Sequence, residues 1–183
     1  MSNFYELTIQ KIIKETDNAI SITFEIPENL KNEFQYKAGQ YITIKKELAG
    51  EEVRRAYSLC SKPNSNEFKV AVKAVDNGTF SVFATTILKE GDVLQASKPE
   101  GKFVLETSKN TSKNYIGIAA GSGITPIMSM IKAVLNEEPN STFTLLYGNK
   151  KVAETIFKSE IDALKKQFPS TFNVQYVLSR EEH

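Results

Sequence analysis

The stretch that decides the fold is YIGIAAGSGIT at Tyr115–Thr125, followed at once by Pro126. Its first half is a short apolar run, typical of a buried strand, and it ends in the turn Gly121–Gly123. Thr125 is then placed to be the N-cap of a helix, with Pro126 at the first helical position. A strand, a glycine turn and a helix N-terminus together present unpaired N–H groups and a positive dipole end, which suits a phosphate. The pattern Gly-x-Gly-x-x-Pro is weak by itself, because an ordinary strand-to-helix turn looks the same.

Downstream of this stretch, strand and helix patterns alternate. Apolar periodicity predicts helices over 126–136 and 154–168, and strands over 143–147 and 172–178. Such alternation predicts βαβ units and a parallel sheet. Three strands are fewer than the five or six of a complete doubly wound nucleotide-binding fold. We therefore expect residues 113–183 to be a partial parallel α/β nucleotide-binding domain, truncated at its C-terminus.

Upstream, residues 1–106 have a β pattern. Short alternating apolar segments between Pro, Gly and Asn predict several strands, which favours a small antiparallel β-barrel of the Greek-key type. One helix interrupts them at about 81–89, with Ser81 or Thr79 as its N-cap. The polar segment 107–114 is the expected linker between the two domains.

Charge and composition exclude several classes of function. The 23 basic and 22 acidic residues nearly cancel, so neither nucleic acid nor an anionic membrane surface is an expected partner. No apolar run is long enough to span a bilayer. Cys60 is the only cysteine and His183 the only histidine, so an internal disulfide, a cysteine- or histidine-based metal site and a histidine-dependent triad are not expected. A single cysteine also fits a reducing compartment, and we expect a cytoplasmic protein.

Two further segments offer groups suited to a ligand with a flat ring and a charged tail. Arg55 and Tyr57 lie two residues apart at the end of a predicted strand, so their side chains share a face, and Ser58 begins the turn. A guanidinium binds phosphate, and an aromatic ring offers a stacking surface. At Gly78–Ser81 a glycine again precedes a helix N-terminus. Taken alone, the two segments are better explained by a barrel strand with an exposed arginine and by an ordinary capped helix.

Five short motifs in register resemble the ferredoxin–NADP reductase family over nearly the whole chain. They are Arg55-x-Tyr57-Ser58, Gly78-x-x-Ser81, Gly91-Asp92-x-Leu94, Pro99-x-Gly101-x-Phe103 and Gly121-x-Gly123-x-x-Pro126. The segment RAYSLCS at 55–61 is most similar to the reductase components of multicomponent oxygenases, of the phenylacetyl-CoA oxygenase reductase type. The sequence departs from the family at Lys98, where a glycine is common, and it does not contain the family's Cys-Gly-Pro motif of the nicotinamide pocket.

The resemblance implies an FAD site in the barrel. Arg55 would bind the FAD pyrophosphate, Tyr57 would stack on the isoalloxazine ring, and Ser58 would lie near the ring's N5, which accepts the hydride. Val72 and Lys73 would line the path of the adenosine and phosphates. The residues that would hold the pyrophosphate are Gly78, Thr79, Phe80 and Ser81.

The resemblance also implies a pyridine-nucleotide site in the second domain. Thr125 would lie close to the reacting rings and, with Tyr57 and Ser58, would form the catalytic set. The other residues of this site would be Gly121, Ser122, Gly123, Pro126, Tyr147, Gly148 and Asn149. Ser179 and Arg180 are similar to the family's pair that grips the 2′-phosphate, which favours NADPH over NADH. A guanidinium suits a phosphate, and no acidic residue directly follows the strand at 143–147 to bind a free ribose diol.

These implications predict a flavoprotein oxidoreductase that passes electrons from NADPH through FAD to an iron–sulfur domain or partner, as the reductase component of an oxygenase system. Any [2Fe–2S] ligands would lie outside this chain, because one cysteine cannot hold such a cluster. Two alternatives stay open. The chain could be an FAD-binding module that NADPH does not reduce in this truncated form, or a non-catalytic interaction domain with an empty barrel.

Overall fold

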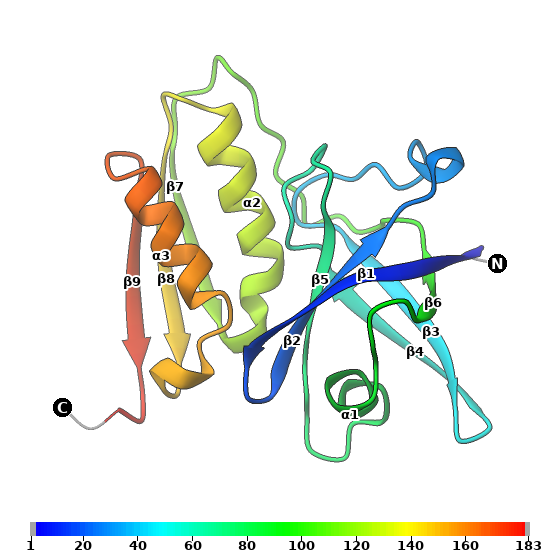
Figure 1. The fold of residues 1–183 in the computed structure, drawn as a ribbon. Helices are drawn as coiled ribbons and strands as arrows, with labels where there is room; N and C mark the ends of the chain where they lie inside the picture. Colours follow the sequence, from blue (N-terminus) through cyan, green and yellow to red (C-terminus); the bar gives the residue numbers. More distant parts are fainter. Residues whose placement is uncertain (1–2, 182–183) are drawn as a thin grey trace.

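The computed structural model describes residues 3–181, whose strands form two separate sheets (Figure 1). The strands of the first sheet are β1 (Phe4–Thr16), β2 (Ala19–Glu25), β3 (Tyr41–Leu48), β4 (Glu51–Ser58), β5 (Phe68–Lys73) and β6 (Val93–Ser97). Those of the second are β7 (Asn114–Ala120), β8 (Thr142–Asn149) and β9 (Phe172–Leu178). The α-helices are α1 (Thr79–Thr86), α2 (Ile124–Glu137) and α3 (Lys158–Gln167), and the 3-10 helices are η1 (Glu28–Leu30), η2 (Gly121–Gly123) and η3 (Val152–Glu154).

The first sheet is antiparallel throughout and curls into a barrel. Its strand order is β4-β3-β6-β1-β2-β5, so β6 returns to lie between β1 and β3, a connection of the Greek-key type. A bridge between Leu59 and Val70 joins the end of β4 to β5, and this contact closes the sheet on itself. Inward-facing aliphatic side chains such as Ile22, Ile44 and Val70 have no exposed surface. The predicted antiparallel barrel is confirmed.

The second sheet is parallel, with the order β7-β8-β9, and α2 and α3 cover the same face of it (Figure 1). Two successive right-handed crossovers in one direction place both helices on one side. The opposite face is bare, since Ile116, Ile118 and Val177 are 72%, 74% and 54% exposed. The predicted partial α/β arrangement is confirmed.

Helix α2 lies between the second sheet and the barrel (Figure 1). The core around it contains small barrel residues, among them Ala38, Cys60 and Ala71, which let the helix approach closely. The segment 107–113 has no helix or strand, as predicted for a linker, but it is anchored: the N–H of Ser108 donates to Glu138, at the end of α2. Domain boundaries at 106 and 113 stay a prediction.

The helix predicted over 154–168 is shorter in the structure. The α-helix occupies only Lys158–Gln167, and η3 precedes it. Phe157 has a left-handed backbone, with φ of 61°, and this reversal separates the two helices. The predicted apolar face is nevertheless present, because Phe157 and Ile161 are buried against α2 and β8 in one core.

Candidate functional site

Three segments far apart in the sequence line one cleft, of about 530 Å³, where the barrel meets the N-terminus of α2. The first two segments belong to the barrel half, and the third begins α2. The lining residues are Arg55, Ala56, Tyr57, Ser58, Ala71, Lys73, Val75, Gly78, Thr79, Phe80, Ser81, Ser122, Gly123, Thr125 and Pro126. The structure therefore brings together the three motifs that the sequence singled out.

On β4, Arg55 and Tyr57 line the cleft together, as their spacing predicts. The ring of Tyr57 packs against Phe80 of α1, with centroids 5.7 Å apart and planes tilted by 42°. Burial raises the pKa of the Tyr57 phenol to about 12 although the charge of Arg55 opposes the rise, so the phenol is neutral at pH 7. The exposed Arg55 guanidinium donates a 2.7 Å hydrogen bond to the carbonyl oxygen of Arg54. Because a guanidinium has five donors, it can bind an anion while keeping this bond.

The N-terminus of α1 forms the second wall of the cleft. Its N-cap is Gly78 and no side chain caps this end, so the prediction of Thr79 or Ser81 as the N-cap was wrong. The Ser81 hydroxyl instead accepts a 3.2 Å hydrogen bond from the N–H of Val75, which fastens the preceding turn. A Cβ on Gly78 would lie 2.3 Å from Ser81 Oγ and 2.6 Å from a Val75 methyl carbon, so only glycine fits. The first-turn N–H groups of α1 thus keep no side-chain acceptor, which suits a phosphate.

The N-terminus of α2 forms the third wall. The Gly121–Gly123 segment is the 3-10 helix η2, which runs directly into α2, and its first glycine has φ of +51°. The N-cap is Gly123, so the predicted N-cap role of Thr125 was wrong: its hydroxyl lies inside the first turn and donates to the Ser122 carbonyl at 3.1 Å. Pro126 is the third residue of α2 rather than the first, and it fits there because first-turn N–H groups have no intrahelical acceptor.

Two predicted site residues are buried in the cores instead of lining the cleft. Val72 has no exposed surface and belongs to the barrel core, whereas its neighbours Ala71 and Lys73 line the cleft. The side chain of Val72 therefore cannot line a cofactor path. Tyr147 is also fully buried, and its hydroxyl donates to the carbonyl oxygen of Gly121 at 2.9 Å. It supports the glycine turn from within the core.

The remaining predicted residues form a separate group at the C-terminal ends of β8 and β9. The N–H of Ser179 donates to the Asn149 carbonyl at 3.0 Å, and the N–H of Arg180 donates to the Lys150 carbonyl at 2.9 Å. Gly148 pairs in register with Val177 in the same region. Among residues 3–181, the Asn149 side-chain nitrogen is a buried polar atom without a hydrogen-bond partner. Such atoms are rare, and this one lies where parallel sheets bind ligands.

These groups fit a dinucleotide flavin and a pyridine nucleotide. A guanidinium and a helix N-terminus, at Arg55 and Gly78, suit a pyrophosphate, and a partly buried aromatic ring at Tyr57 suits a flat ring system. The glycine turn and α2 N-terminus supply a second phosphate-type site. The sequence analysis missed three lining residues, Ala56, Ala71 and Val75, because small and aliphatic side chains carry no chemical signal.

Comparison with known proteins identifies the family. An oxidoreductase FAD-binding domain model matches residues 6–105, and an oxidoreductase NAD-binding domain model matches residues 118–183. The chain belongs to the ferredoxin–NADP reductase family. It is 37% identical over 181 residues to a component of the 1,2-phenylacetyl-CoA epoxidase of Escherichia coli K12, covering 99% of this chain and 51% of that protein. It is 32% identical over 175 residues to the ferredoxin reductase component of 3-ketosteroid-9-alpha-monooxygenase from Rhodococcus rhodochrous, covering 94% of this chain and 48% of that protein.

Solved structures of this family share the fold. Ferredoxin–NADP+ reductase from Plasmodium falciparum, solved with 2′P-AMP, superposes with a TM-score of 0.83 at 24% identity, over 98% of this chain and 75% of that one. Models of the family's FAD-binding and NAD-binding domains both match this chain, and the predicted family is confirmed. The chain spans about half the length of the curated relatives it matches. Within residues 3–181, no helix has the length and apolar character needed to cross a membrane, and no cluster of three metal-ligating side chains occurs.

Proposed function

We propose that this chain is the flavin-reducing part of an oxygenase reductase, which passes electrons from NADPH through FAD to an iron–sulfur domain or partner protein. The observation that carries the proposal is the shared cleft, in which Arg55, Tyr57 and the α1 N-terminus face the α2 N-terminus. The names of the two relatives support the oxygenase context. The same proposal includes that the acceptor carries an iron–sulfur cluster and that the protein is cytoplasmic.

Each wall of the cleft has a distinct task in this proposal. Arg55 and the α1 N-terminus bind the pyrophosphate of FAD, and Tyr57 orients the ring. Bound FAD would accept a hydride from NADPH and release electrons singly to the acceptor. Ser58 and Thr125 line the same cleft, and in this proposal they lie beside the reacting rings. No protein acid or base is needed for the hydride itself.

The preference for NADPH rests on the group at the ends of β8 and β9. Arg180 lies beside Lys150, since their backbones are hydrogen-bonded, and Lys151 follows Lys150 in the sequence. The one carboxylate placed beside them, that of Glu181, already accepts a 2.8 Å hydrogen bond from the N–H of Val152. We propose that Ser179 and Arg180 bind the 2′-phosphate. Replacement of Arg180 by Ala should lower kcat/KM for NADPH while leaving that for NADH nearly unchanged.

An anaerobic titration of the purified chain with NADPH, followed by flavin absorbance, tests the proposal. Bleaching at about one equivalent is expected, since a two-electron donor fully reduces one flavin. The second candidate, an FAD-binding module that NADPH does not reduce, is favoured by the small three-stranded second sheet and would leave bound flavin unbleached. A chain that binds no flavin at all would overturn the proposal and leave the interaction-domain alternative.

A further inference from the structure

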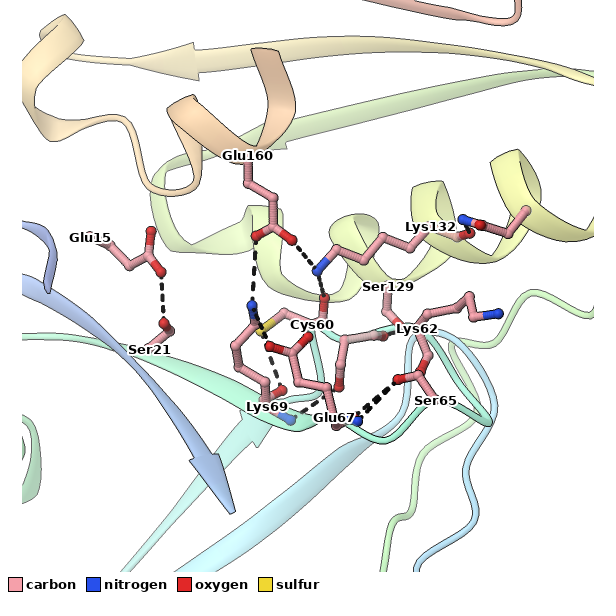
Figure 2. Close-up of polar contacts among 12 residues, drawn as sticks. Glu15, Ser21, Cys60, Lys62, Ser65, Glu67, Lys69, Ser129, Lys132 and Glu160 are labelled. Carbon is pink, nitrogen blue, oxygen red and sulfur yellow. Dashed lines mark hydrogen bonds and ion pairs between the residues drawn. The ribbon is translucent and has the colours of Figure 1, made fainter. Parts of the chain in front are cut away.

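A polar network of two buried lysines and two partly exposed glutamates joins the barrel to the α/β half (Figure 2). Lys132 of α2 and Lys69 of β5 are only 7% and 5% exposed, although lysine is rarely buried. Glu160 of α3 lies between them: its carboxylate is 2.6 Å from Lys132 Nζ and 3.7 Å from Lys69 Nζ. Glu67 completes the set at 3.0 Å from Lys69 Nζ, so two cations meet two carboxylates.

The network ends on the turn that follows β4. Lys132 Nζ donates to the carbonyl oxygen of Cys60 at 3.0 Å, and Ser129 Oγ donates to the carbonyl oxygen of Ser61 at 2.7 Å. Ser129 and Lys132 are three residues apart and therefore lie on one side of α2. One face of α2 thus holds two consecutive carbonyl groups of the barrel, and the partners of these two hydrogen bonds are 68 and 72 residues apart in the sequence.

The barrel turn is itself rigid. The hydroxyl of Ser61 accepts from the N–H of Lys69 at 3.0 Å and shares a 2.8 Å hydrogen bond with the hydroxyl of Tyr36. The N–H of Cys60 donates to the Lys69 carbonyl at 2.9 Å. A displacement of α2 would therefore break bonds to a fixed partner rather than carry a loose loop with it.

The network connects the two ends of the proposed reaction site. The turn at Cys60–Ser61 follows two residues after Ser58, on the flavin side of the cleft. Thr125, on the nicotinamide side, is seven residues before Lys132 on the same helix, which is about 10 Å at 1.5 Å rise per residue. Because a helix is stiff over that length, the position of Lys132 fixes the position of the glycine turn.

We propose that Lys132 and Ser129, with Glu160 as the counter-ion, are positioning residues that hold α2 in one orientation against the β4 turn and so set the separation of the two cofactor sites. None of these three side chains lines the cleft. The link to hydride transfer rests on the proposed function. The orientation of α2 does not depend on the proposed function, and it can be measured in the protein without cofactors.

The first test measures that orientation in the protein without cofactors. Glu47 on the barrel and Lys165 on α3 are exposed, and each is changed to Cys for attachment of a nitroxide spin label. The native Cys60, which is fully buried, is changed to Ser so that only these two positions carry a label. Pulsed electron–electron double resonance should give one narrow distribution of the distance between the two spin labels in the parent protein. Lys132→Met should broaden or shift it. Ser129→Ala should do so more weakly, and because it leaves no buried charge unpaired it guards against a variant that fails to fold.

Lys158→Met is the matched control, because Lys158 pairs with Asp162 at 2.6 Å within α3 and does not reach the barrel. Its distribution should match that of the parent. If Lys132→Met and Ser129→Ala also keep the parent distribution, the proposal is overturned.

The second test concerns the reaction. In Lys132→Met, the rate of flavin reduction by NADPH should fall about tenfold or more, because a misplacement of about 1 Å can cost up to a hundredfold. FAD affinity should stay within about twofold, since no cleft residue is changed, and Lys132→Arg should restore much of the rate. An unchanged rate would contradict the proposal. A parent chain that NADPH does not reduce would instead contradict the proposed function, and the distance measurement would still decide the orientation.

Discussion

At the scale of single residues, the two neighbouring arginines of β4 have opposite surroundings. Arg54 donates from Nε to Glu52 at 2.7 Å and lies over the ring of Phe4, whereas Arg55 lines the cleft. Arg55→Ala should weaken FAD binding about 10- to 100-fold, because a hydrogen bond to a charged group contributes about 1.5–3 kcal/mol. Arg54→Ala should change it less than about twofold, since an exposed ion pair contributes little. Quenching of flavin fluorescence during titration gives both affinities, and equal losses would contradict the assignment.

Gly78 is the residue on which the α1 wall of the cleft depends. A Cβ there would overlap Ser81 Oγ and Val75, so Gly78→Ala should lower the free energy of unfolding by about 1–3 kcal/mol, as overpacking does. Gly123→Ala is the matched control, because its Cβ would meet no atom within 4 Å and its φ is −63°. Its effect should stay within about 0.5 kcal/mol. Urea denaturation measures both, and a tolerated Gly78→Ala would show that the turn can move.

At the scale of elements, a buried carboxylate at the end of α2 helps to hold the segment between the two sheets. Glu138 is 1% exposed, and it accepts hydrogen bonds from the Ser141 hydroxyl at 2.7 Å and the Ser108 N–H at 3.0 Å. Burial alone would raise its pKa, but these hydrogen bonds outweigh it, and the pKa is lowered from 4.5. A lowered pKa in the folded state means that the ionised form stabilises the fold above pH 4.5, and that this stabilisation is lost as the pH falls through the folded-state pKa.

Glu138→Gln should therefore destabilise the protein at neutral pH and matter progressively less in acid. The difference in unfolding free energy between parent and variant should be constant above about pH 5.5 and shrink below about pH 4.5, where Glu138 becomes protonated first in the unfolded chain and then, at lower pH, in the folded protein. Urea denaturation from pH 3 to 7 measures it, and amide hydrogen exchange in 107–113 reports whether the segment is released. A difference that does not vary with pH would mean that the charge of Glu138 plays no part.

The elements also show what the sequence could predict and what it could not. Period-2 and helical apolar patterns predicted the strands and α2 because burial of one face determines them. The burial of the Val72 and Tyr147 side chains was not predicted, because alternate residues of a strand face the core or the cleft and only the register decides which. Ser129 and Lys132 passed unnoticed, since their partners, the carbonyls of Cys60 and Ser61, are distant in sequence and backbone groups carry no residue-type signal.

At the scale of the whole molecule, α2 is shared by two packing units. Eleven of its residues are buried, and the core around it includes residues of both the second sheet and the barrel. The bare face of the second sheet, by contrast, leaves large aliphatic side chains in solvent. The free energy of unfolding should therefore depend strongly on isoleucines that are buried around α2, and only weakly on isoleucines that lie on the bare face of this sheet.

Ile131 and Ile118 make this comparison directly, because they are 0% and 74% exposed. Ile131→Ala should lower the free energy of unfolding by about 2–5 kcal/mol, since it loses transfer free energy and leaves a cavity where α2 packs. Ile118→Ala should cost about 1 kcal/mol or less, the range of strand propensity alone. Chemical denaturation followed by far-UV circular dichroism measures both. A large loss for Ile118→Ala would mean that the bare face is covered in solution, and a small loss for Ile131→Ala would mean that α2 does not join the two halves into one folding unit.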